Sequence, residues 1–136
     1  MLYLQETFVG EKTGVINVSA LRSWCVKVKR KPEKFGFTLP NTAELITAHD
    51  FDDTAKSRLE YLMNNPVDLM KPLLLATWDD TRGVYILDGW HRLLVFYKCA
   101  MQLEANVVPF LALKVTQQEA ERFSLSVLNH NNRKIN

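Results

Sequence analysis

The stretch Val84-Tyr85-Ile86-Leu87-Asp88-Gly89-Trp90-His91-Arg92 joins an apolar, β-branched run to a second apolar run. Its first four residues predict a strand. Residues from His91 to about Met101 predict a helix without a polar face, which we expect to be largely buried. Leu73–Thr77 is another strand-like run, and the polar turn at 79–83 predicts that it pairs with the first strand in antiparallel fashion. The centre of the chain therefore predicts an α/β fold.

The N-terminal half adds further predicted elements. A strand at 15–18 precedes Ser19, a plausible helix cap, and a helix is expected from there to about Val28. Prolines, a glycine and interleaved aromatic residues predict a binding loop at 31–40. A second helix is expected from a cap at Asp52 or Asp53 to about Asn64, ended by Pro66. Its expected buried stripe consists of Leu59, Leu62 and Met63.

The C-terminal part predicts one strand and one helix. Asn106–Val115 has the pattern of a strand, and Thr116-Gln117-Gln118-Glu119 matches a capping box that opens a last helix. We expect Ala120, Phe123 and Val127 to face inward. Together the elements predict a single α/β (α+β) domain over residues 1–136, with a small mixed sheet flanked by helices.

Composition limits the class of protein. The 136 residues are 47% hydrophobic and 24% charged, which is typical of a globular domain. Cys25 and Cys99 form neither a disulfide framework nor a metal pattern, and Cys99 is expected to be buried. The N-terminus does not resemble a signal peptide, and no apolar run is long enough to span a bilayer. We therefore expect a cytoplasmic protein without a membrane partner.

Basic residues gather in one part of the sequence, although the formal net charge of +2 is too small to indicate nucleic-acid binding. Such a run is usually a solvated face, and the alternative is a surface that faces phosphates. Its members are Arg22, Lys27, Lys29, Arg30, Lys31 and Lys34.

The turn after the Val84 strand has the composition of a phosphate-binding site. A helix N-terminus offers unpaired N–H groups and a partial positive charge. Gly89 lets the backbone approach a ligand, and Arg92 adds a planar fork of donors that matches phosphate oxygens. His91 adds a donor or a general acid or base near neutral pH.

Asp88 is the unusual member of this turn, because a carboxylate repels phosphate. It would bind Mg²⁺, activate an attacking hydroxyl or water, or cap the helix. The structural alternative is that Asp88 caps, Gly89 turns and Arg92 pairs with a surface carboxylate. Composition alone leaves the two interpretations open.

A strand ending in Asp-Gly, followed by His-Arg at the start of an apolar helix, resembles the core motif of the ParB/sulfiredoxin superfamily. Members carry a glycine and an arginine three residues later, here Gly89 and Arg92, and Asp-Gly-x-His-Arg is similar to the version in free-serine kinases. Residues 15–21, 68–74 and 128–133 resemble flanking segments of the family in the same order.

The resemblance implies a nucleotide-binding domain, with Mg²⁺ and ATP or another nucleotide as cofactors. Asp88 would be catalytic and hold the metal, and His91 would be catalytic. The implied phosphate- or nucleotide-binding residues are Gly89, Trp90, His91, Arg92, Asn129 and Arg133.

The chain departs from the family at several points. Trp90 takes the place of the sulfiredoxin cysteine, which excludes that thiol chemistry. No helix-turn-helix domain follows, so ParB-style loading on DNA is not expected. The segment from Cys25 to His49 has no counterpart.

The sequence leaves several functions open. Mg²⁺-dependent phosphoryl transfer or hydrolysis, ATPase- or kinase-like, is the leading expectation. The alternatives are a non-catalytic DNA- or protein-binding module of a plasmid or phage, and a ParB-like nuclease. Trp90 would stack on a base or fill the core, and His130 and Arg133 would return to the turn or belong to a frayed terminus. The oligomeric state and the substrate stay open.

Overall fold

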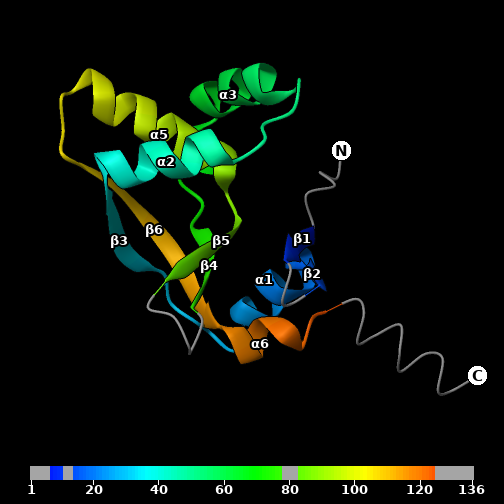
Figure 1. Ribbon diagram of the computed structural model, residues 1–136. Helices are drawn as coiled ribbons and strands as arrows, with labels where there is room; N and C mark the ends of the chain where they lie inside the picture. Colours follow the sequence, from blue (N-terminus) through cyan, green and yellow to red (C-terminus); the bar gives the residue numbers. More distant parts are fainter. Residues whose placement is uncertain (1–6, 11–13, 78–82, 125–136) are drawn as a thin grey trace, which may run out of the picture. The chain divides into compact units, whose positions relative to one another are not determined.

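The structure, a computed structural model, describes residues 7–10, 14–77 and 83–124. The predicted α/β class is confirmed, and the sheet has the strand order β3-β6-β4-β5 (Figure 1). None of the helices in these ranges is long and apolar enough to cross a bilayer. The elements are β1 (Thr7–Gly10), β2 (Gly14–Asn17), α1 (Val18–Lys27), β3 (Glu33–Thr38), α2 (Leu39–Ala48), α3 (Ala55–Asn64), α4 (Pro66–Leu69), β4 (Leu73–Thr77), β5 (Val84–Asp88), α5 (Trp90–Gln102), β6 (Val107–Thr116) and α6 (Gln117–Glu121).

The chain forms two packed units. The first unit comprises residues within 1–31, 74–88 and 113–136, and the second comprises 32–73 and 89–112. Strand β6 contributes residues to both. The single domain expected over residues 1–136 stays a prediction.

The first unit is built around a core of side chains from α1, β2, β4, β5, β6 and α6. Strands β4 and β5 pair antiparallel, as predicted, with Thr77 opposite Val84. Helix α1 is capped by Asn17, whose side chain accepts a hydrogen bond from the N–H of Ala20 at 3.0 Å. The predicted cap at Ser19 is therefore wrong. The core residues are Ile16, Val18, Leu21, Cys25, Leu74, Ala76, Leu87, Leu113, Val115 and Ala120.

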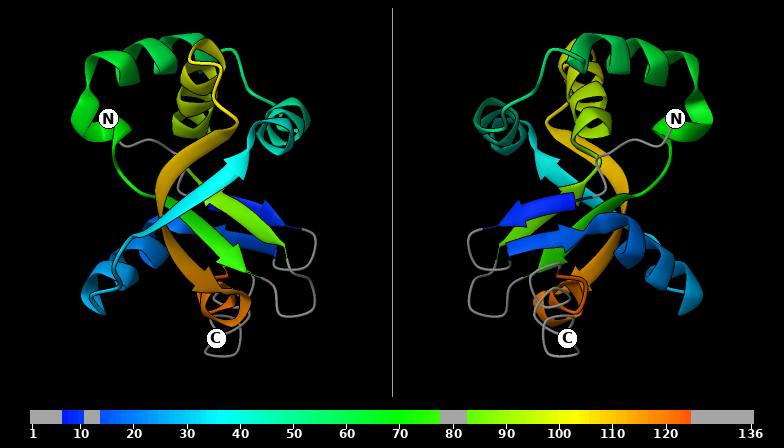
Figure 2. Two further views of the ribbon diagram at one scale, coloured as in Figure 1. Left: turned by 90° about the vertical axis from the view of Figure 1, so that its left-hand side faces the viewer. Right: turned by 90° about the vertical axis from the view of Figure 1, so that its right-hand side faces the viewer.

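The second unit contains α5 between α2 and α3, as both views of Figure 2 show. Strand β3 pairs antiparallel with β6 along residues 33–38, so the predicted loop at 31–40 is wrong there. The aromatic residues that suggested a binding loop instead pack on the sheet. Phe35 stacks on Phe110 with ring centroids 6.1 Å apart, and Phe37 meets the same ring edge-on at 4.9 Å.

Local details of the helices in this unit also differ from expectation. The N-cap of α3 is Thr54, and Asp52 accepts the Thr54 N–H at 2.9 Å, so the aspartate shapes the preceding turn. Leu62 is buried, but Met63 is 61% exposed. Cys99 is exposed as well, because the second half of α5 presents one side to solvent. The predicted burial of Met63 and Cys99 is wrong. Val127 and the turn residues 79–82 lie outside the described residues.

Candidate functional site

The start of α5, in the second unit, depends on a glycine. Gly89 is the N-cap of α5 and has φ 107° and ψ 18°, a left-handed conformation in which L side chains are strained. A Cβ at Gly89 would lie 2.7 Å from Cγ of the buried Leu73. The glycine is therefore required by the fold, and the N-cap supplies no side-chain hydrogen bond to the first turn of α5.

Arg92, in this first turn, holds the chain that enters β4. Its guanidinium donates to the carbonyl oxygens of Lys71 at 3.0 Å and Pro72 at 3.3 Å. The same group lies beside the turn, since Nη2 is 3.1 Å from the position of a Cβ on Gly89. Arg92 thus places positive charge at the start of α5, and backbone carbonyls orient it.

Trp90 and His91 belong to an aromatic cluster with His49 and Phe51. Trp90 stacks on His49, with ring centroids 4.0 Å apart and planes 12° from parallel. Phe51 meets His49 edge-on at 4.6 Å and His91 at 5.4 Å. The stack covers one face of Trp90, so a base would stack on the other face or displace His49.

Burial lowers the pKa of His49, against an opposing effect of Asp50 and Asp52. A neutral imidazole therefore stacks on Trp90 at neutral pH. His91 is only 8% exposed, which places it below the surface of the cluster. Gly89 is also buried, whereas Trp90 and Arg92 are partly exposed. Neither His49 nor Phe51 was part of the predicted site, because isolated aromatic residues after a helix give no periodic signal.

Asp88 belongs to the first unit, at the end of β5. Its Oδ2 accepts a hydrogen bond from Arg22 Nη2 at 2.8 Å, and the two side chains are 21% and 26% exposed. Asp88 does not cap α5, because the N-cap is Gly89. In the part of the chain that the structure describes, no group of three His, Cys, Asp or Glu side chains is placed to hold a metal.

In the basic run at 22–34, the two arginines form ion pairs, whereas the lysines are exposed. Besides the Arg22–Asp88 pair, Arg30 binds Glu119 with two hydrogen bonds of 2.6 and 2.7 Å and lies 5.1 Å from the centre of the Trp24 ring. These arginines therefore stabilise the first unit. The four lysines of the run are exposed, as expected for a solvated face.

The remaining predicted residues, Asn129, His130 and Arg133, lie outside the described residues. Comparison of the chain with protein-family models, curated proteins and solved structures finds no match. The resemblance to the ParB/sulfiredoxin superfamily therefore depends on the quoted motifs. The geometry itself supplies a helix N-terminus with an arginine beside it, which is an arrangement that can attract an anion.

Proposed function

We propose that the chain binds a nucleotide or another phosphate ligand at the start of α5. One observation carries the proposal: the first turn has no side-chain cap and no acidic residue, yet it contains Arg92. A cation is electrostatically unfavourable near the positive end of a helix dipole, and an anion relieves both charges. The N–H groups that follow Gly89 and the Arg92 fork would hold the phosphate, and Trp90 would contact the base. Asn129 and Arg133 would add contacts from the C-terminal segment.

The proposed chemistry is Mg²⁺-dependent phosphoryl transfer or hydrolysis, with Asp88 and His91 as the catalytic pair. Mg²⁺ is often bound by one or two protein carboxylates together with the phosphates, so one aspartate is sufficient in number. Arg22 already neutralises Asp88, however, and a metal would have to compete with it. When bound, Mg²⁺ would neutralise phosphate charge. We expect the protein to act on this ligand in the cytoplasm.

A non-catalytic DNA-binding module is the second candidate. The exposed lysines Lys27, Lys29 and Lys31, after or at the end of α1, favour it because exposed cations neutralise a phosphate backbone. A protein-binding module and a ParB-like nuclease stay as further alternatives from the sequence. DNA retention that falls with salt, without any requirement for nucleotide, would favour the module.

Calorimetric titration of ATP, with and without Mg²⁺, tests the binding proposal with the variant Arg92→Gln. Glutamine keeps a donor for the Lys71 or Pro72 carbonyl but removes the charge. A charge-assisted hydrogen bond contributes about 1.5–3 kcal/mol, so we expect the affinity to fall roughly ten- to a hundredfold. Lys56→Gln, an exposed lysine of α3, is the control. Equal affinity in wild type and Arg92→Gln would contradict the proposal.

Asp88→Asn separates the enzyme from the binding module. If Asp88 holds metal or acts as a base, the variant loses turnover and stays folded, which thermal melts check. If its charge only repels phosphate, the variant binds ATP more tightly. Tighter binding in the presence of Mg²⁺, with no turnover in wild type, would rule out the enzymatic proposal.

A further inference from the structure

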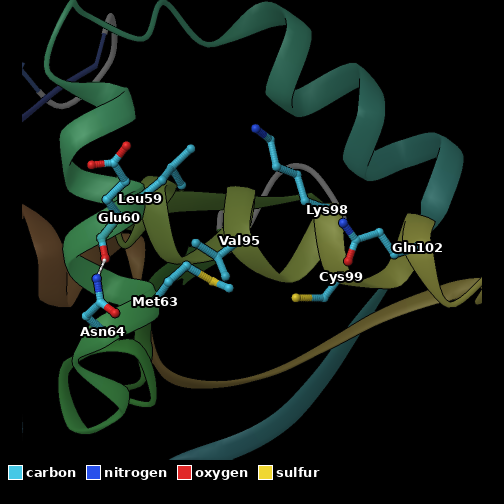
Figure 3. A pocket seen from close by; sticks show the side chains of 8 residues that line it. All are labelled: Leu59, Glu60, Met63, Asn64, Val95, Lys98, Cys99 and Gln102. Carbon is cyan, nitrogen blue, oxygen red and sulfur yellow. Dashed lines mark hydrogen bonds between the residues drawn. The ribbon is translucent and has the colours of Figure 1, made fainter.

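A groove of about 300 Å³ lies between α3 and α5, in the second unit and apart from the first turn of α5. Figure 3 shows the side chains that line it. Leu59 and Met63 of α3 and Val95 of α5 supply an apolar floor. Lys98, Cys99 and Gln102 line the α5 side. The volume is at the lower end of the range that small-ligand sites occupy.

The two charged side chains that line the groove, Lys98 and Glu60, point in different directions. In Figure 3 the Lys98 side chain rises from α5, and the carboxylate of Glu60, which also lines the groove, points away from α5. Asn64 is engaged within its own helix, since its amide donates to the carbonyl oxygen of Glu60 at 3.0 Å. Among the described residues, the side chains of Lys98 and Gln102 make no hydrogen bond or ion pair. The groove therefore combines an apolar floor with the Lys98 ammonium, and its one lining carboxylate, Glu60, is directed away from α5.

We propose that this groove binds a small anionic amphiphile, with an unbranched alkyl chain on the floor and its carboxylate on Lys98. Burial of the alkyl chain supplies most of the affinity, because the free energy gained grows with the apolar area removed from water. A single lysine matches a single negative charge, and the Gln102 amide can donate to the second carboxylate oxygen. A nucleoside triphosphate does not fit this groove, because its polar sugar and phosphates would not cover the apolar floor.

Cys99 provides a direct reporter of occupancy. It is the exposed thiol at the groove, whereas Cys25 is buried and burial raises its pKa. A neutral maleimide should therefore alkylate Cys99 first in the folded protein. Decanoate, added below its micelle-forming concentration, should slow this alkylation at least fivefold. Decanol should protect less well, and decyltrimethylammonium should protect least.

Calorimetry of decanoate binding tests the role of Lys98. Lys98→Gln should weaken decanoate binding about tenfold while leaving decanol binding unchanged, and Lys56→Gln, outside the groove, should change neither. ATP affinity should be the same in wild type and Lys98→Gln, which keeps this test separate from that of the phosphate site. Absence of decanoate binding, equal protection by decyltrimethylammonium, or equal decanoate affinity in Lys98→Gln would overturn the proposal. A dimer, seen by light scattering, in which Cys99 is protected from alkylation without decanoate and decanoate changes nothing, would also overturn it.

Discussion

Helices α5 and α6 both begin directly after a strand, but their first turns are satisfied in opposite ways. At α6 the Thr116 side chain accepts from the Glu119 N–H at 3.1 Å, and the Glu119 carboxylate accepts from the Thr116 N–H at 2.9 Å. At α5 the N-cap is Gly89, which has no side chain to offer, and the first turn carries Arg92. The start of α6 is complete by itself, whereas the first turn of α5 has no side-chain cap. The start of α5 is where we propose that an anion binds.

Gly89→Ala should have the largest effect on stability. The new Cβ is strained at φ 107° and overlaps buried Leu73, so we expect a loss of about 2–4 kcal/mol in the free energy of unfolding. Urea denaturation measures the loss. Gly36→Ala is the matched control: its Cβ would lie 2.8 Å from Cγ1 of Val107, which is 46% exposed and can move aside. Equal losses in the two variants would show that the Gly89 conformation is not critical.

Glu119→Gln should have an intermediate effect that depends on pH. The hydrogen bond from Arg30 is the main cause that lowers the pKa of Glu119 from 4.5 to about 2. The carboxylate therefore stabilises the fold fully above pH 4.5, and this contribution is lost as the pH falls toward 2. Near neutral pH we expect a loss of about 1–2 kcal/mol in the variant. Urea denaturation from neutral pH down toward pH 2 should show that the difference in free energy of unfolding between wild type and Glu119→Gln shrinks as the pH falls. A difference that stays constant would contradict a stabilising role of the ionised Glu119.

His49→Phe should have the smallest effect, on the pH dependence alone. Burial lowers the pKa of His49 below 6.5, so the folded state loses stability as the pH falls through 6.5 and protonation of the ring becomes favourable in the unfolded chain. Phenylalanine can keep the stack on Trp90 but cannot titrate. Thermal melts should show a smaller loss below pH 6.5 in the variant than in wild type. An identical pH dependence would show that His49 is not the titrating group.

The sequence predicted the elements whose signals are local. The antiparallel pair β4–β5, the strand β6 and the capping box at Thr116 each depend on neighbouring residues, and each is confirmed. Strand β3 was missed because its pairing with β6 joins residues far apart in the chain. Its glycine and the flanking prolines are typical of a loop. The packing of its aromatic residues on Phe110, which favours a strand, is visible only in the structure.

The sequence predicted only part of the candidate site, because its other contacts also join residues far apart in the chain. Gly89 and Arg92 are marked by their spacing after a strand, but their contacts with Leu73 and with the Lys71 and Pro72 carbonyls are tertiary. The partner of Asp88 was equally hidden. Arg22 is 66 positions away in the chain, and nothing local connects the two. The aromatic partner of Trp90 also comes from a distant segment.

An NMR titration of the backbone amides with ATP, in the presence and absence of Mg²⁺, tests phosphate binding at the start of α5 most directly. We expect the N–H signals of Trp90, His91 and Arg92 to shift with increasing ATP. The N–H signals of Gln117, Gln118 and Glu119, at the capped start of α6, should stay in place. Shifts of the same size at both helices, or shifts confined to the lysines that follow α1, would contradict a phosphate site at the start of α5.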